Sequence, residues 1–378
     1  MQCIFLNALL YNNGRQRPYT GVRMNKYVKR YLIDGMSGMA QGLFASLLIG
    51  TIIKTLGQQL LLLNQNPVFK FFVDAGNFAT DAHVVGAAMA VGIAYAMKAP
   101  MLVLLSAAAV GSAANVTGGA GGPLAVLVIA IIAIELGNLV SKKTKVDILV
   151  TPLVTILSGA LLTVLTAKYI GLAASSVGKL VVWATKLHPF LMGMLVSVII
   201  GIALTLPISS AAICAAFGLT GLAGGAAVAG CCAQMVGFAV MSFKENRWGG
   251  ILSQGLGTSM LQMPNIVKNP RIWIPPTLAS LITGPVATCI FKMEMNGAAV
   301  SSGMGTCGMV GPIGVITGWF SPSETAIGHG AAAISPTFFD WLGLVLVCIV
   351  LPGVLSWAFG LLLRKIGWIK ENDLLLEE

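Results

Sequence analysis

The sequence has 378 residues, of which 56% are hydrophobic and only 10% are charged. A soluble domain of this length would carry about 25% charged residues, so the composition excludes an ordinary soluble protein and predicts an all-α polytopic membrane protein. The net charge of +10 comes largely from Lys and Arg gathered in short connections, at residues 15–30, 142–145, 244–247 and 364–365. This clustering is typical of cytoplasmic loops, so we interpret the charge as membrane topology and expect no nucleic-acid partner.

Residues 1–36 form a predicted cytoplasmic lead-in. The stretch Met24-Asn-Lys-Tyr-Val-Lys-Arg30 is basic, and Met24 is a second candidate start, which would leave residues 1–23 outside the native protein. Positive charges flank the apolar part of the chain at both ends. Both termini, including the tail at residues 365–378, are therefore expected in the cytoplasm.

Residues 37–170 form the predicted N-terminal transmembrane half. Apolar runs that could span about 30 Å of hydrocarbon occupy residues 38–63, 77–97, 101–114, 122–140 and 147–167. Residues 171–188 follow a different pattern, because Lys179 and Lys186 lie two turns apart among apolar residues. This pattern favours an amphipathic helix that lies in the membrane interface.

Residues 189–364 form the predicted second transmembrane half. Crossings are expected at residues 189–206, 208–243, 272–291 and 338–363, with the Gly- and Ala-rich run 208–243 folding as two closely packed helices. Two further segments, residues 249–269 and 297–318, are too interrupted for ordinary spans and predict a pair of re-entrant hairpins. The whole chain is thus expected to have about ten transmembrane helices.

The segment at residues 257–276 combines four prolines with a row of amide and hydroxyl side chains. Proline leaves backbone groups without helical partners, and lipid cannot satisfy them, so such a segment must be buried in protein or line a watery cavity. Neutral amides and hydroxyls suit an uncharged, polyhydroxylated ligand, which is the favoured interpretation, and the alternative is that they satisfy the freed backbone groups. The candidate substrate-binding residues from the two interrupted segments are Gln254, Thr258, Ser259, Gln262, Asn265, Asn269 and Thr306.

Charged side chains within apolar runs are costly in lipid and are functional candidates by default. Lys54 and Glu135 are possible intramembrane charges, and Asn77, Asp81 and His83 give a polar start to another apolar run. For Asp81, helix capping and a substrate or ion role fit the pattern equally well. For Glu135, pairing or snorkelling near the lysines that follow it is the favoured interpretation.

The cysteines and histidines show no metal-binding pattern. Six of the seven cysteines lie in apolar or Gly-rich segments, there is no CxxC motif, and the chain has three histidines. The cysteines are therefore interpreted as small packing residues, with neither a disulfide framework nor a metal site expected.

The stretch Asn269-Pro-Arg-Ile-Trp-Ile-Pro-Pro276, preceded by Met263-Pro264, resembles the Leu-Pro…Asn-Pro…Ile-Pro signature of the sugar-transporting IIC components of the bacterial phosphotransferase system. With Arg30-Tyr-Leu-Ile-Asp-Gly-Met-Ser-Gly-Met39 included, the pattern is closer to a IIC-like branch often labelled toxin regulators, similar to the perfringolysin regulator protein. The resemblance covers the chain from Met24 onward.

The resemblance implies a IIC fold in a bacterial plasma membrane, usually as a homodimer. One half would dimerise while the other carries a sugar across, and separate IIB and IIA proteins would supply the phosphoryl group. This chain would have no catalytic residue of its own, no phosphorylated residue and no cofactor.

One departure from the family pattern affects the expected site. The Glu-Pro pair that classical members carry before the Asn-Pro is replaced here by Gly257-Thr-Ser-Met260. A carboxylate at the sugar would then come from elsewhere, with Asp81 and Glu135 as candidates. Two alternatives to a sugar permease stay open, namely a IIC-like membrane sensor that regulates gene expression and an ion-coupled transporter that uses Asp81, His83 or Glu135.

Overall fold

The computed structural model describes residues 26–64 and 66–376. Within these ranges every regular element is a helix, and the only strand-like pairing is a single bridge between Gly221 and Met295. The expected all-α architecture is confirmed for this part of the chain.

A long helix opens the described chain through α2 (Gly35–Leu43) and α3 (Ile49–Leu63), because the backbone stays in the right-handed α region at each joint. α4 (Pro67–Ala79) packs back against α3. The start of α4 is fixed locally: Asn66 accepts a hydrogen bond from the Val68 amide, and Pro67 occupies the first turn, where its missing N–H costs nothing.

α4 and α5 (Ala82–Ala96) form a pair bent by 55°. The bend lies at Asp81, whose backbone leaves the helical region at φ −58° and ψ 136°. The Asp81 carboxylate accepts a hydrogen bond from the His83 amide at 2.8 Å. Asp81 therefore starts α5 as its N-cap.

α6 (Met101–Gly118) and α7 (Gly122–Val140) pack against one another as a helical hairpin. The connection requires Gly119, whose φ of 51° and ψ of −120° are accessible to glycine but strained for other residues. Their packing gives the N-terminal half a core of small and aliphatic side chains.

α8 (Asp147–Leu162) continues without a break into α9 (Lys168–Ala184), which gives one helical run of 38 residues. The expected amphipathic helix at residues 171–188 is thus mostly the continuation of the preceding span. Its location in the membrane interface stays a prediction.

The second half is built around α12 (Gly221–Met241), which is almost entirely buried. α12 packs against α10 (Pro189–Thr205), α15 (Ile274–Pro285) and α19 (Leu351–Ile366). A Cβ placed on Gly230 would lie 1.9 Å from the Ser197 carbonyl oxygen, so α10 and α12 approach this closely because position 230 is a glycine. The short helix α11 (Ser210–Ala216) precedes α12.

The two interrupted segments are fragmented as the prolines and glycines predict. The first contains α13 (Phe243–Gly250), a π-helical turn at Ile251–Gly257, a 3₁₀ turn at Ser259–Gln262 and α14 (Met263–Lys268). The second contains 3₁₀ turns at Ala299–Gly303 and Cys307–Met309, then α16 (Val310–Phe320). Their re-entry into a membrane stays a prediction.

Six helices of the described chain are long and apolar enough to cross a membrane, or seven if the bent α4–α5 pair counts as one span. The two shorter apolar helices, Pro189–Thr205 and Cys307–Phe320, fall below this length. A multi-spanning helical membrane protein is therefore supported, while the expected number of spans is not reached by this criterion.

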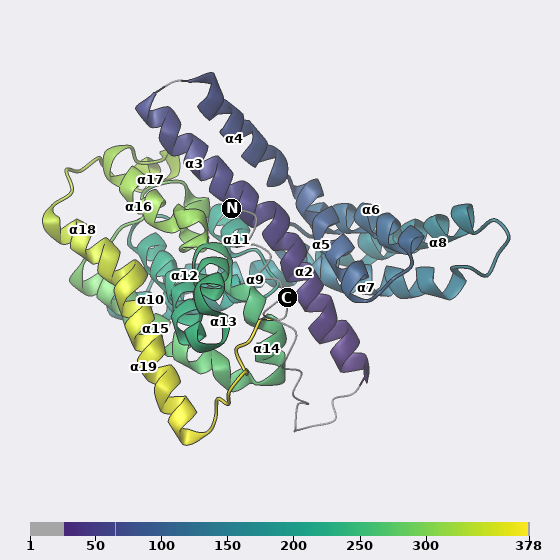
Figure 1. The fold of residues 1–378 in the computed structure, drawn as a ribbon. Coiled ribbons are helices and arrows are strands. Elements are labelled where there is room, and N and C mark those ends of the chain that lie inside the picture. The colour runs from purple at the N-terminus through teal and green to yellow at the C-terminus, as the bar shows by residue number, and fades with distance from the viewer. Residues whose placement is uncertain (1–25, 65, 377–378) are drawn as a thin grey trace, which may run out of the picture.

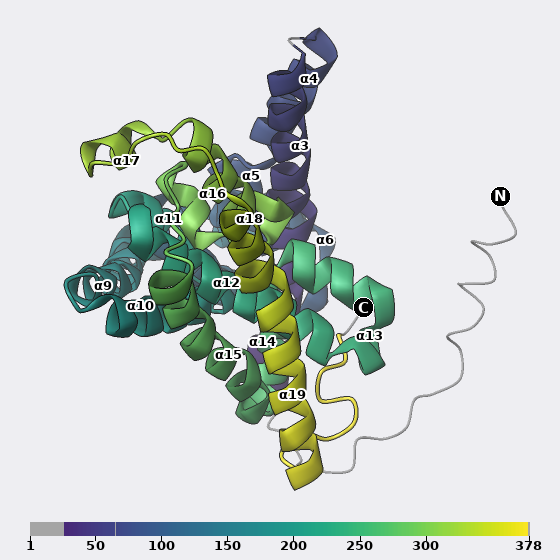
Figure 2. The same cartoon turned by 90° about the vertical axis from the view of Figure 1, so that its left-hand side faces the viewer.

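In Figure 1, α6, α7 and α8 extend to the right, α10 to α19 gather on the left, and the long α2–α3 helix lies between the two groups. α18 (Phe338–Val345) and α19 carry the chain down one edge. After Gly367, at φ 84°, the chain turns back without regular helix and runs past α13 and α14 (Figure 2). We call residues 367–376 the C-terminal segment.

Candidate functional site

Four buried polar side chains form a continuous hydrogen-bonded chain across the first interrupted segment. Gln254 Nε2 donates to Ser242 Oγ at 2.9 Å, and Gln262 Nε2 donates to Gln254 Oε1 at 2.9 Å. Asn265 Nδ2 then donates to Gln262 Oε1, also at 2.9 Å. Three residues predicted from the sequence are therefore brought together, on elements that the prolines and glycines keep short.

The series of hydrogen-bonded side chains ends on the C-terminal segment. Side-chain amides donate to its backbone carbonyl oxygens along its length, and we call the four donors, Asn246, Gln262, Asn265 and Asn269, the amide row. The acceptors are Leu374 O (2.7 Å from Asn246 Nδ2 and 2.9 Å from Gln262 Nε2), Leu375 O (2.8 Å from Asn265 Nδ2) and Trp368 O (3.0 Å from Asn269 Nδ2). The Leu376 amide donates in return to Asn246 Oδ1 at 2.9 Å.

Side chains of the C-terminal segment add further contacts. Ile369 and Leu374 are buried in a hydrophobic cluster that joins the N-terminal helices to α12 and α14. The Arg271 guanidinium lies 5.1 Å above the Trp368 ring, a cation–π distance. The Asp373 carboxylate accepts from Asn269 Nδ2 at 2.7 Å and from the Lys370 amide at 2.8 Å.

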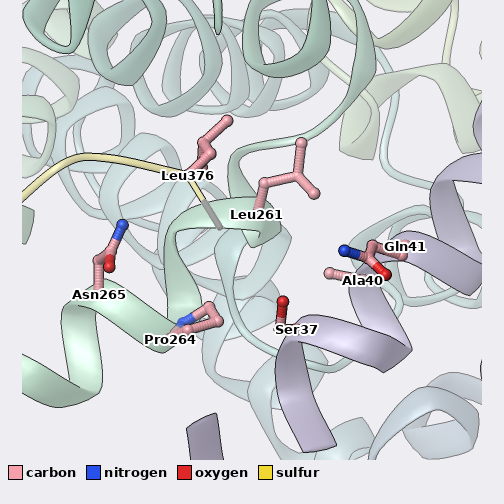
Figure 3. A pocket seen from close by; sticks show the side chains of 7 residues that line it. All are labelled: Ser37, Ala40, Gln41, Leu261, Pro264, Asn265 and Leu376. Carbon is pink, nitrogen blue, oxygen red and sulfur yellow. The ribbon is translucent and has the colours of Figure 1, made fainter. Parts of the chain in front are cut away.

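A cavity of about 20 Å³ lies where the amide row, the C-terminal segment and α2 meet. Figure 3 shows Asn265 and Leu376 on one side of it and Ser37 and Gln41 of α2 on the other, with Leu261 between them. This volume is enough for one water molecule. It is far below the roughly 300–1,000 Å³ of a small-molecule site.

Two open grooves flank the C-terminal segment. One, of about 650 Å³, is lined by Lys244, Glu245, Arg364 and residues of the segment. The other, of about 690 Å³, is lined by Gln41, Asn246 and Ser253, again with residues of the segment. Glu245 lines both grooves.

Glu245 has one satisfied and one unsatisfied carboxylate oxygen. Its Oε1 lies 2.7 Å from Arg364 Nη2, in a pair whose side chains are only 5% and 16% exposed, respectively. Its Oε2 is buried and has no hydrogen-bond partner among the described residues. A buried acceptor in this state has lost its water without gaining a donor.

Ser259 belongs to a second polar cluster, in which Ser259, Thr205 and Gln234 are fully buried. Its Oγ lies 2.8 Å from Thr205 Oγ1, and Gln234 Oε1 accepts from Trp273 Nε1 at 2.9 Å and from Thr205 Oγ1 at 3.4 Å. Sequence reasoning did not select Gln234 or Thr205. The signal for Gln234 was present, because it is the one amide side chain in the Gly- and Ala-rich helix α12.

Thr258 and Thr306 make local contacts. Thr258 Oγ1 accepts from the Met260 amide at 3.2 Å and caps the following 3₁₀ turn. Thr306 is buried, and its Oγ1 lies 3.7 Å from the Met235 sulfur. Neither side chain is hydrogen-bonded to the amide row.

The candidates at the α4–α5 bend lie apart from the amide row. Asn77, Asp81 and His83 are exposed, and His83 Nδ1 lies 2.8 Å from Ser112 Oγ. Among the described residues no hydrogen bond links these three side chains to the amide row. Lys54 is half-buried on α3, where Gly76 of α4 approaches it closely.

Glu135 forms an ion pair with Arg30, and not with the lysines that follow it in the sequence. Its Oε1 lies 2.9 Å from Arg30 Nη2 and 3.0 Å from Arg30 Nε, so one carboxylate oxygen receives two guanidinium donors. Both side chains are about one-third exposed. The pairing joins the start of the long first helix to α7 and offers no free charge to a ligand.

The described residues contain no group of three or more His, Cys, Asp or Glu side chains that could hold a metal ion. Their cysteines are free, and all except Cys289 are buried. The site consists mainly of neutral amides and hydroxyls, and its nearest carboxylate is Asp373, 2.7 Å from Asn269 Nδ2.

Comparison with known proteins gives one match. The sequence model of a protein family described as "Phosphotransferase system, EIIC" matches residues 33–376. No curated protein matches the chain, and no solved structure matches it. The matched range contains both halves, the amide row and the C-terminal segment.

Proposed function

Because the chain belongs to the EIIC family of the phosphotransferase system, and is thus a membrane component of such a transporter, we propose that it is a sugar permease subunit. In this proposal it binds a sugar, carries it across the membrane and presents it to a separate IIB protein for phosphorylation. The family match and the apolar helices make it a multi-pass membrane protein. The matched family also implies a sugar substrate and cooperation with other phosphotransferase components.

The observation that carries the proposed sugar site is the amide row. Side-chain amides that are fixed by one another and aimed at a row of acceptor oxygens can donate equally well to sugar hydroxyl oxygens. Gln262 and Asn265 are buried, and their orientation is set by Gln254 and by each other. Such pre-arranged donors bind a polyhydroxylated ligand without first having to be ordered.

The other sequence candidates have different parts in the proposal. Thr258 and Ser259 shape the backbone beside the amide row, whereas Asn77, Asp81, His83 and Thr306 would contact the sugar only along its path. Lys54 and Glu135 are proposed to have structural roles and not to contact the sugar. In the proposal, this protein contributes no catalytic side chain to the bound sugar. The phosphoryl group would come from IIB, which is itself phosphorylated by IIA.

We also propose a homodimer in a bacterial plasma membrane, with both termini cytoplasmic. Residues 37–170 would supply the dimer contact, and residues 189–364 would move the sugar. The exposed apolar side chains of α8, such as Ile148 and Leu157, support a surface that is covered by lipid or by a second copy. Cross-linking of purified protein in membranes, at cysteines placed along α8, tests the dimer.

Uptake into proteoliposomes tests the proposed function. A radiolabelled panel of D-glucose, D-galactose, D-fructose and D-mannitol should include a substrate, whose uptake requires phosphoenolpyruvate and the IIA and IIB proteins. Uptake driven by a proton or sodium gradient alone would contradict the proposal. Binding without uptake under any condition would point to a sensor.

The role of the amide row is tested by Asn269→Ala and Asn265→Ala. Asn265→Ala should weaken sugar binding by about 1–3 kcal/mol, the cost of losing a buried hydrogen bond. Asn269→Ala should weaken it by about 0.5–1.5 kcal/mol, because the hydrogen bonds of Asn269 are exposed or only partly buried. Asn64→Ala is the matched control, because Asn64 lies in the exposed connection between α3 and α4. Unchanged binding in folded Asn265 and Asn269 variants would show that the sugar binds elsewhere.

A further inference from the structure

We propose that the C-terminal segment is a built-in occupant of the sugar site. It covers the amide row in the state described here, and a sugar binds only after the segment has moved away. The inference rests on the proposed function, because it concerns the accessibility of the same site. It adds a regulatory element, residues 367–376, within the chain itself.

The segment uses the same hydrogen-bond donors that a sugar would need. Both N–H groups of the Gln262 amide are used, one by Gln254 Oε1 and one by Leu374 O. Both N–H groups of Asn265 are likewise used, by Gln262 Oε1 and Leu375 O. A sugar hydroxyl can accept from these amides only where a carbonyl of the segment gives up its place, since each N–H donates to one good acceptor at a time.

The cavity beside the amide row is too small for a sugar while the segment is in place. The cavity beside Asn265 holds about 20 Å³, and Leu376 of the segment forms part of its wall. A monosaccharide does not fit into the volume of one water molecule. The grooves on the two sides of the segment hold about 650 and 690 Å³. The larger groove already reaches Asn246, and with the segment gone the two grooves would open onto Gln262 and Asn265 as well.

The C-terminal segment is held in a way that permits its release. It has no regular helix, and it leaves α19 at Gly367, whose φ of 84° lets the chain reverse direction. Two apolar side chains, Ile369 and Leu374, are buried, while Leu375 is exposed. Its backbone has only isolated turn hydrogen bonds, such as that from the Asp373 amide to Lys370 O. A segment with few buried side chains and no continuous helix belongs to the less stable parts of a fold.

Glu245, beside the segment, has one unsatisfied carboxylate oxygen. Its Oε2 is buried without a donor while the segment is in place, and Glu245 lines both flanking grooves. Departure of the segment would let water or a sugar hydroxyl donate to this oxygen. An unsatisfied buried acceptor costs free energy, so a donor reaching this oxygen after the segment leaves would favour the open state.

Binding measurements on three purified variants test the inference. A truncation that removes residues 367–378 deletes the occupant, and Leu374→Asp forces a carboxylate into a fully buried apolar position and should release the segment. Leu375→Asp is the matched control, since it makes the same substitution at the neighbouring position, where the side chain is 38% exposed. None of these side chains belongs to the amide row.

The sugar panel used for uptake serves as the probe, with binding measured by titration calorimetry. The truncated and Leu374→Asp proteins should bind a panel member at least about tenfold more tightly than wild type, because apparent affinity scales with the open fraction. The Leu375→Asp protein should bind like wild type. Equal binding by all four proteins would overturn the inference and leave the proposed function intact, whereas no binding by any of them would overturn both.

Hydrogen–deuterium exchange on the wild-type protein provides a test that requires no variant to fold. The Leu376 amide is bonded to Asn246 Oδ1, and the Lys370 amide to Asp373. Saturation with the tightest-binding sugar should accelerate exchange in residues 368–376 by about tenfold or more, as competition requires. Unchanged or slower exchange would show that sugar and segment bind together, which contradicts the inference.

Discussion

The ion pair between Arg364 and Glu245 should stabilise the protein far more than the pair between Arg30 and Glu135. Their closest atoms lie at similar distances, 2.7 and 2.9 Å. They differ in burial, since the side chains are 16% and 5% exposed in the first pair and 36% and 33% exposed in the second. Burial, rather than distance, is therefore expected to set the energetic difference.

Removal of one partner from a buried pair costs about 3–5 kcal/mol, whereas exposed pairs contribute about 0–1 kcal/mol. Arg364→Met keeps most of the apolar stem but leaves the Glu245 carboxylate without any donor, because Oε2 already has none. Glu245→Gln should cost less. In the Glu245→Gln protein, the Arg364 guanidinium would still donate to Met241 O at 3.4 Å, and it would still line the open groove.

Thermal and denaturant unfolding of the purified protein in detergent micelles measures these differences. Arg364→Met should lower the free energy of unfolding by about 3–5 kcal/mol, and the double variant Glu245→Gln/Arg364→Met by less than the sum of the single losses. Arg30→Met and Glu135→Gln serve as the exposed controls. Equal losses for the two pairs, or additive losses in the buried pair, would refute the assignment of stability to burial.

Two further predictions concern single positions. Gly230→Ala should destabilise the protein by about 1–3 kcal/mol through overpacking, because the new Cβ would lie 1.9 Å from a backbone carbonyl of α10. Gly353→Ala is the control, because the nearest atom to its new Cβ would be a side-chain carbon at 3.4 Å. It should be neutral or stabilising in the same unfolding assay. Equal losses of stability in the Gly230 and Gly353 variants would contradict the packing explanation. Asp81→Ala should cost about 1 kcal/mol as a lost helix cap, while Asp81→Asn should keep both stability and sugar uptake. Loss of uptake in a folded Asp81→Asn protein would show that the charge itself is required.

Sequence reasoning located the polar, broken part of the fold because its cause is local. Prolines at 264, 270, 275 and 276 forbid a continuous helix whatever surrounds them. The amides between them had to be satisfied in an apolar chain, so their burial could also be expected. Gln262 and Asn265 are indeed buried and hydrogen-bonded to each other.

The partners of these residues could not be predicted in the same way. Asn265 donates to the carbonyl of Leu375, which lies 110 positions later, and composition gives no sign of which distant segment returns to the site. The partner of Glu135 shows the same limit. The lysines that follow it were the nearest cations in sequence, but the fold places Arg30, 105 positions earlier, beside it.

The number of transmembrane spans was difficult to predict from the sequence for a related reason. Hydropathy separates apolar runs at polar residues, so Lys168 appeared to end a span. In the structure a π-helical turn at Thr163–Ala167 keeps the backbone helical through that lysine. Conversely, α10 and α16 are apolar but have 17 and 11 residues, fewer than the six long apolar helices.

The uninterrupted α8–α9 run places a demand on the surrounding lipid. At 1.5 Å per residue its 38 residues extend about 57 Å, nearly twice the roughly 30 Å hydrocarbon thickness of a bilayer. Only 22% of its most apolar window is buried inside the protein. Tilts of natural transmembrane helices rarely exceed about 40°, which is too little to absorb this excess, so part of the run must leave the hydrocarbon or the bilayer must thicken around it. The transporter should therefore respond to acyl-chain length, with short-chain lipids forcing more of α9, including Lys179, out of the membrane.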